Sequence, residues 1–129
     1  MELISDFQMK EQCVVTSTRL SYLSRVKELD PDIRTGYIIS AAYGDYYSDD
    51  DVDFISIRSS FVSGKLVEAA HEKGKALHAW TVNNKSEMER MKMLGVDNII
   101  TDYPVLAREI VYRERPTETL FEYLRLVLK

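Results

Sequence analysis

Two short segments carry the side chains best suited to chemistry, and each includes a stretch typical of a β-strand. The first is His78–Asn83 (His-Ala-Trp-Thr-Val-Asn), and the second is Gly95–Pro104 (Gly-Val-Asp-Asn-Ile-Ile-Thr-Asp-Tyr-Pro). Parallel α/β folds place binding and catalytic groups at the carboxyl ends of their strands. The two segments therefore predict one functional edge, built from two strands with a helix between them.

Single side chains at this edge have both functional and structural interpretations. Trp80 lies on the same face of its strand as His78, because strand side chains alternate, and it is either the wall of a pocket or a core aromatic near the rim. His78 is predicted to be a hydrogen-bonded core residue, because no second ligand at metal-binding spacing accompanies it. Asn83 and Asp102 are expected to bind turn backbone, with direct ligand contact as the alternative. Ser17 ends an earlier strand, where its hydroxyl can face the pocket or serve the following turn.

An acidic run between residues 45 and 53 is the densest cluster of carboxylates. Asp49, Asp51 and Asp53 have the spacing of the start of an EF-hand loop. Phe54 stands where that loop requires glycine, and Ser60 where it requires glutamate. The pattern therefore predicts a solvated loop.

The elements that must position these residues follow from hydrophobic spacing and turn signals. Strands are predicted at 13–17, 35–39, 54–57, 76–82 and 99–100, because these segments are apolar and β-rich. Helices are predicted over about 1–10, 20–29, 64–73, 85–94 and from 104 onward, with a further C-terminal helix over 117–129. Ser63 and Asn84 are expected to cap two of them, and Pro104 to occupy the first position of another.

This order is β-α-β-loop-β-α-β-α-β-α, with one helix before it and one after it. Strands alternating with helices predict an α/β fold with a parallel sheet. One architecture that fits is a compact doubly wound sheet of five strands. The other is part of a (β/α)₈ TIM barrel, with about five parallel strands and covering helices. Periodicity alone does not choose between them.

Composition excludes several classes of function. The chain has 129 residues, with 21 acidic and 17 basic side chains and a net charge of −4, which disfavours nucleic acid as a partner. No apolar run approaches the ~20 residues needed to span a bilayer, so no direct membrane span is expected. The acidic N-terminus is unlike a signal peptide. The single cysteine, Cys13, is expected to be a buried thiol, and no intrachain disulfide can form.

Several segments together resemble the glycerophosphodiester phosphodiesterase family. The strongest match is the Trp-Thr-Val-Asn motif, one helix, and then Gly-Val-Asp with Ile-Ile-Thr-Asp, which resembles the C-terminal part of the family domain. The resemblance runs from about Val14 to Val111, and the 56–83 stretch looks most like members with N-terminal membrane helices. Weaker matches lie at Val14–Ser17, Leu29–Ile33, Gly36–Tyr37, Asp53–Ile57 and Leu66–His71. Localisation stays open, with a membrane-associated parent protein as one possibility.

The resemblance implies a (β/α)₈ barrel of which residues 1–129 supply the last five strands. The complete enzyme would hydrolyse a glycerophosphodiester to glycerol 3-phosphate and an alcohol with a divalent metal, Mg²⁺ or Ca²⁺. The substrate-binding residues expected in this chain are Trp80, Ser17 and Asn83, with Trp80 shaping the alcohol or glycerol side of the pocket.

The family's catalytic groups have no counterparts at matching positions. The family carries a His-Arg-Gly segment and a Glu-x-Asp metal motif on its first strands, and this chain contains no His-Arg. Glu28-Leu29-Asp30 has the Glu-x-Asp spacing, but it lies at a predicted helix end before Pro31, which indicates a coincidence. We therefore predict no catalytic and no metal-binding residue in this chain, and no activity of the chain alone.

Two other classes of function remain open. A non-enzymatic partial barrel would act by partner binding or self-association, because a five-stranded piece exposes two strand edges that favour a homo-oligomer. A receiver-type signalling domain would need an acidic pair after the first strand, where this chain has Thr16-Ser17-Thr18.

Overall fold

A computed structural model describes residues 1–40 and 48–113. The strands are β1 (Val14–Ser17), β2 (Arg34–Ile39), β3 (Phe54–Arg58), β4 (Ala76–Trp80) and β5 (Asn98–Ile99). The helices are α1 (Glu2–Asp6), α2 (Leu20–Leu29), α3 (Gly64–Glu72), α4 (Lys85–Leu94) and α5 (Pro104–Tyr112), with short 3₁₀ turns at Lys10–Gln12 and Ser59–Phe61. The helix predicted over 117–129 lies outside the described residues.

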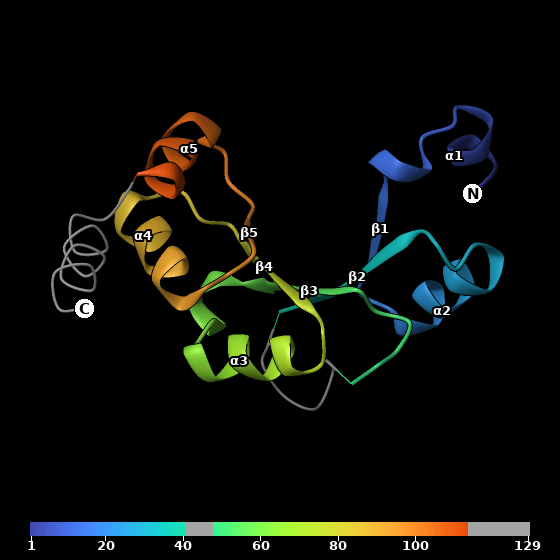
Figure 1. Ribbon diagram of the computed structural model, residues 1–129, viewed down its shortest axis with the longest axis horizontal. Coiled ribbons are helices and arrows are strands. Elements are labelled where there is room, and N and C mark those ends of the chain that lie inside the picture. Colours follow the sequence, from blue (N-terminus) through green and yellow to red (C-terminus); the bar gives the residue numbers. More distant parts are fainter. Residues whose placement is uncertain (41–47, 114–129) are drawn as a thin grey trace, which may run out of the picture.

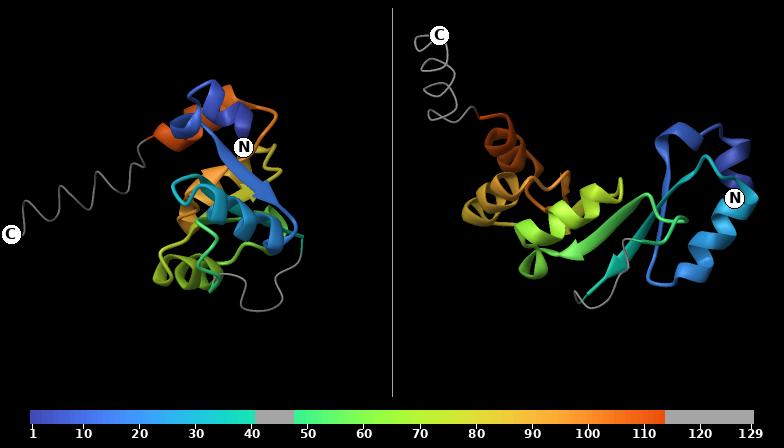
Figure 2. Two further views of the ribbon diagram at one scale, coloured as in Figure 1. Left: turned by 90° about the vertical axis from the view of Figure 1, so that its right-hand side faces the viewer. Right: turned by 60° about the horizontal axis from the view of Figure 1, so that its bottom comes forward.

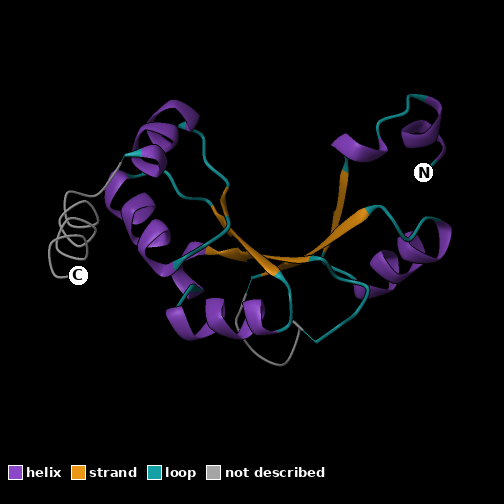
Figure 3. Ribbon diagram, in the orientation of Figure 1, coloured by secondary structure: helices purple, strands orange, loops and turns teal. Residues whose placement is uncertain are grey.

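The strand order distinguishes between the two predicted architectures. All five strands are parallel and lie in the order β1-β2-β3-β4-β5, so every strand pairs with the next in sequence (Figure 1). A doubly wound sheet reverses its strand order at a switch point and carries helices on both faces. Here the sheet curves, and α2, α3, α4 and α5 lie along its convex face (Figure 3). This is the arrangement of a partial (β/α)₈ barrel, as the resemblance predicted.

The hydrophobic core lies between the convex face of the sheet and these helices. Alternate strand residues point to it, among them Ile55 and Ile57 of β3 and Leu77 and Ala79 of β4, all fully buried. They pack against helix side chains that include Leu23, Val67, Met88, Met91 and Ile110. The other face of each strand forms the concave side of the sheet, which none of the described helices covers (Figure 2).

Local signals place the helix ends where the sequence predicts them. Ser63 Oγ accepts a hydrogen bond from the Leu66 amide, and Asn84 Oδ1 accepts one from the Glu87 amide, so both residues are N-caps. Pro104 opens α5, and Gly74 follows α3 with a φ of +69°. These caps determine where each helix begins relative to the end of the preceding strand.

Two expectations need correction. Cys13 is partly exposed rather than buried, because it lies just before β1 at the edge of the sheet. His78 is half-buried, but it packs by ring stacking on Phe54, with centroids 4.1 Å apart and planes at 19°, instead of forming the expected hydrogen bond. The aromatic neighbour comes from the adjacent strand, and a single-strand pattern does not reveal it.

Candidate functional site

The carboxyl ends of β3, β4 and β5 lie next to one another at one end of the sheet. β3 ends at Arg58 and β4 at Trp80, and these two residues are register partners. The loop after β4 brings Asn83, and the loop after β5 brings Asp102. We call these four residues (Arg58, Trp80, Asn83 and Asp102) the rim site.

Asn83 joins the two predicted motifs through three hydrogen bonds. Its Nδ2 donates to Asp102 Oδ2 over 2.7 Å, while its Oδ1 accepts from the Asp102 amide over 2.9 Å and from Thr101 Oγ1 over 3.2 Å. Thr101 Oγ1 in turn accepts from the Tyr103 amide over 3.0 Å. The Val82 amide also donates to the Ile100 carbonyl over 2.9 Å. The two motifs therefore form one hydrogen-bonded bracket between the loops after β4 and β5.

Trp80 lies on the concave side of the sheet at the end of β4. It alternates with Leu77 and Ala79, which point to the helices, and it is partly buried. The Arg58 guanidinium carbon lies over its ring, 5.6 Å from the ring centroid. The indole Nε1 is buried and has no hydrogen-bond partner among the described residues. An indole face, its N–H and a guanidinium thus gather at the edge where (β/α)₈ barrels bind substrates.

Arg58 is the residue of this site that sequence reasoning missed. The strand Phe54–Ile57 was predicted one residue short, so Arg58 was not placed at a strand end. The available signal was a single cation directly after a buried apolar run, at the edge where Trp80 was also expected. Its pairing with Trp80 depends on the register of β3 with β4, which one sequence pattern cannot supply.

The centre of the concave face is aromatic and basic. Phe54 stacks on His78 and lies beneath the Arg34 guanidinium at 5.9 Å, and a Cβ on Gly36 would lie 2.2 Å from the Phe54 ring. Burial, followed by the positive charge of Arg34, lowers the pKa of His78. Both effects favour the neutral form of His78, which stacks on Phe54.

Ser17 is placed away from the other two predicted substrate-binding residues. It pairs in register with Tyr37, which packs against the helix-side core, and β2 and β3 separate β1 from β4. Its Oγ accepts a hydrogen bond from the Arg19 amide over 3.0 Å, which is turn chemistry ahead of α2. Trp80 and Asn83 are brought together, and Ser17 is not.

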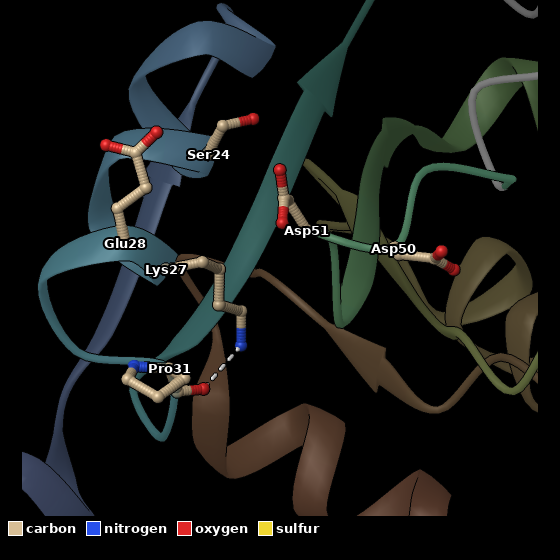
Figure 4. A pocket seen from close by; sticks show the side chains of 6 residues that line it. All are labelled: Ser24, Lys27, Glu28, Pro31, Asp50 and Asp51. Atoms are coloured by element: carbon tan, nitrogen blue, oxygen red, sulfur yellow. Dashed lines mark hydrogen bonds between the residues drawn. The ribbon is translucent and has the colours of Figure 1, made fainter.

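A second polar cluster lies at the opposite end of the sheet, where the strands begin. Lys27 Nζ binds Asp53 Oδ2 over 2.8 Å and donates to the Pro31 and Ile33 carbonyls, and Asp53 Oδ2 also accepts from the Thr35 amide over 2.6 Å. A pocket of about 490 Å³ adjoins it, between α2 and the segment before β3 (Figure 4). Its lining residues are Ser24, Lys27, Glu28, Pro31, Asp50 and Asp51. In (β/α)₈ barrels the amino-terminal ends of the strands contribute to stability, and the chemistry takes place at the carboxyl ends.

Two carboxylates near the amino-terminal ends of the strands have lowered pKa values. Burial alone would raise the pKa of Asp53, but its hydrogen bonds and its ion pair with Lys27 outweigh burial. Burial would likewise raise the pKa of Asp97, but the Leu77 amide at 2.7 Å and His71 Nε2 at 2.8 Å outweigh it. Each carboxylate ties the start of a strand to a neighbouring element, which is a structural role.

The candidate metal motifs are engaged in other contacts. Asp49 Oδ1 accepts from the Asp51 amide, and Asp53 is held by Lys27 and Thr35. Glu28 and Asp30, the Glu-x-Asp pair, bind Arg25 and Lys10 at the end of α2. Among residues 1–40 and 48–113, no group of three or more His, Cys, Asp or Glu side chains is arranged to hold a metal ion.

Comparison with known proteins identifies the family. The model of the glycerophosphoryl diester phosphodiesterase family matches residues 2–106. The chain belongs to that family. A glycerophosphodiester phosphodiesterase from Caldanaerobacter subterraneus subsp. tengcongensis is 28% identical over 107 residues, which cover 81% of this chain and 44% of the relative. The chain spans less than half the length of the curated relatives that it matches.

Solved structures of family members show the same fold. A glycerophosphodiester phosphodiesterase from Parabacteroides distasonis superposes with a TM-score of 0.77 at 18% identity, covering 86% of this chain and 48% of that one. An Oleispira antarctica phosphodiesterase, in complex with the product sn-glycerol-3-phosphate, superposes with a TM-score of 0.69 at 25% identity, covering 76% of this chain and 41% of that one. The five-stranded sheet is therefore about half of a family barrel. No described helix is long and apolar enough to cross a bilayer.

Proposed function

We propose that this chain supplies the C-terminal part of a barrel that hydrolyses glycerophosphodiesters to glycerol 3-phosphate and an alcohol. The family model over residues 2–106 supports this function, as does the sn-glycerol-3-phosphate bound to the Oleispira antarctica relative. The observation that carries the proposal is the position of Trp80. Its ring lies on the concave side of the sheet at the carboxyl end of β4, where a barrel's substrate pocket opens.

The proposed roles of the predicted residues follow from their contacts. Trp80 forms the wall of the pocket on the alcohol or glycerol side. Asn83 acts through its bracket with Asp102, which holds the loop behind Trp80 in place. Ser17 lies at the same edge of the sheet, and its hydroxyl positions the turn after β1. Of these three residues, only Trp80 contacts substrate directly in this proposal.

The described residues do not fit the divalent metal that the family implies. The Asp102 carboxylate accepts from Asn83 Nδ2, Asp49 accepts from the Asp51 amide, and Asp53 is bound by Lys27 and the Thr35 amide. No cluster of metal ligands is formed among the described residues. Mg²⁺ or Ca²⁺ in the complete enzyme would then be held by segments that correspond to the unmatched half of the relatives.

Product release in two preparations tests the proposed function. The chain alone, given a glycerophosphodiester with Mg²⁺ or Ca²⁺, is expected to release no sn-glycerol 3-phosphate. A chimera in which this chain replaces the matched 107-residue segment of the Caldanaerobacter relative is expected to release it. Trp80→Ala in the chimera should reduce the rate at least tenfold. Metal-dependent turnover by the chain alone, or a folded chimera without activity, would contradict the proposal.

Self-association is a second function that one observation favours. β1 and β5 are the edges of the described sheet, and Val14 on β1 is 50% exposed. Unpaired parallel strands invite pairing with another chain. We propose that copies of this chain associate through these edges. A single monomeric species by light scattering at high protein concentration would rule this out.

A further inference from the structure

The guanidinium group of Arg58 covers one face of the Trp80 ring. Arg58 and Trp80 are register partners at the ends of β3 and β4, which lie side by side in the sheet (Figure 1). The guanidinium carbon lies 5.6 Å from the ring centroid, within the range of a cation–π contact. Because the sheet register pairs these two residues, the backbone fixes the position of the Arg58 cation beside Trp80.

The guanidinium donors of Arg58 are uncommitted. Arg58 is exposed, and none of the ion pairs or side-chain hydrogen bonds among residues 1–40 and 48–113 involves its guanidinium. Arg90 differs, because its guanidinium donates to the Ser59 and Val62 carbonyls. Glu87 hydrogen-bonds to Ser59, the residue after Arg58, and to Asn84. A planar guanidinium with free N–H groups is suited to bind the oxygens of a carboxylate or a phosphate, and among ligands that share the phosphate it favours the one that adds a carboxylate.

The same contact disfavours a cationic ligand beside this face of the indole. A quaternary ammonium group is recognised by lying against an open aromatic face. Here that face of Trp80 already carries a cation, and a second positive charge beside it would be repelled. A like-charge contact of this kind changes a binding constant by on the order of tenfold.

We infer that Arg58 determines which alcohol portion the pocket accepts. It favours glycerophosphodiesters whose alcohol carries a carboxylate and disfavours those with a quaternary ammonium group. The inference rests on the proposed function, because it requires the alcohol portion to lie beside Trp80. Arg58 is a specificity-determining residue in this arrangement and takes no part in bond cleavage.

Trp80 is the only tryptophan of the chain, so its fluorescence reports on this site alone. The full chain is titrated with glycerophosphoserine, glycerophosphocholine and sn-glycerol 3-phosphate. We expect the serine ester to bind about tenfold more tightly than the choline ester. Arg58→Gln should reduce the difference to less than about twofold, and Arg58→Lys, which keeps the charge but loses the planar fork, should retain only part of it.

Arg25→Gln is the matched control, because Arg25 is an exposed arginine paired with Glu28 on α2. It should leave the preference unchanged, and circular dichroism checks that each variant is folded. Equal binding of the two esters by the unmodified chain, or a preference that survives Arg58→Gln, would overturn the inference and leave the proposed function intact. No response to any of the three ligands would overturn the proposed pocket and this inference together.

Discussion

Removal of the Asn83 side chain should loosen the rim and destabilise the whole chain. Asn83→Ala deletes three hydrogen bonds, of 2.7, 2.9 and 3.2 Å, one of which is to the Asp102 carboxylate. A neutral hydrogen bond contributes about 1 kcal/mol and one to a charged group about 2 kcal/mol, so full burial would give about 4 kcal/mol. Asp102 is exposed and Asn83 only partly buried, which reduces the expected loss to about 2 kcal/mol.

Urea unfolding of Asn83→Ala at neutral pH measures this loss, and Asn84→Ala is the matched control. Asn84 is the adjacent residue of the same type, but it caps α4 and takes no part in the bracket. Its replacement should cost about 1 kcal/mol through the lost cap. A double-mutant cycle with Thr101→Val should give a coupling energy of about 0.5 kcal/mol or more, because the two side chains are hydrogen-bonded.

Introduction of a negative charge at position 83 separates the loss of the bracket from the loss of side-chain volume. Asn83→Asp replaces the Nδ2 donor with a carboxylate oxygen facing Asp102 Oδ2. Like charges in contact repel, so this variant should be less stable than Asn83→Ala at pH 7. Its stability relative to Asn83→Ala should recover on acidification, as one carboxylate takes up a proton. An Asn83→Ala variant within about 0.5 kcal/mol of the unmodified chain would refute the assigned role of the bracket.

Two further predictions concern packing and charge beneath the rim. Gly36→Ala places a Cβ 2.2 Å from the Phe54 ring and should lower the free energy of unfolding in urea by about 3 kcal/mol or more. The control Gly64→Ala meets only an ordinary 3.8 Å contact and should be neutral or slightly stabilising. Equal effects of the two substitutions would contradict the close packing of Gly36 on Phe54. Folding lowers the pKa values of Asp53 and Asp97 below 3.8. Their stabilisation is therefore complete above that value and is lost as the pH falls through the folded pKa, which is measured as a drop in unfolding free energy below about pH 4. Asp97→Asn should flatten this drop, and an unchanged profile would argue against its hydrogen bonds to Leu77 and His71.

The parts of the fold that depend on local sequence were predictable. Ser63, Asn84 and Pro104 mark helix starts through the backbone groups they satisfy or lack, and these signals act within three residues. The apolar strands were found as well, with ends that differ by one or two residues. Strand order was not accessible in this way, because a β-α alternation gives no information on which strands pair.

The residues of the rim site likewise fall into those that the sequence predicts and those that depend on strand pairing. Trp80, Asn83 and Asp102 were singled out because each stands at the end of a predicted strand or in the loop that follows it. Their partners were not, because the bracket joins residues 18 and 19 positions apart through two adjacent loops. Arg58 became visible only once the register of β3 against β4 was known.

The bracket also explains why the two motifs are informative as a pair. Asn83 has one amide group, and both of its ends are used on the Thr101-Asp102 segment, so neither motif can change alone without leaving polar groups unpaired. The helix between them takes no part in this bracket, because α4 is held by its Asn84 cap and its buried methionines. Trp80 stands three residues before Asn83, so the same bracket that holds the two loops together also places the indole at the mouth of the proposed pocket.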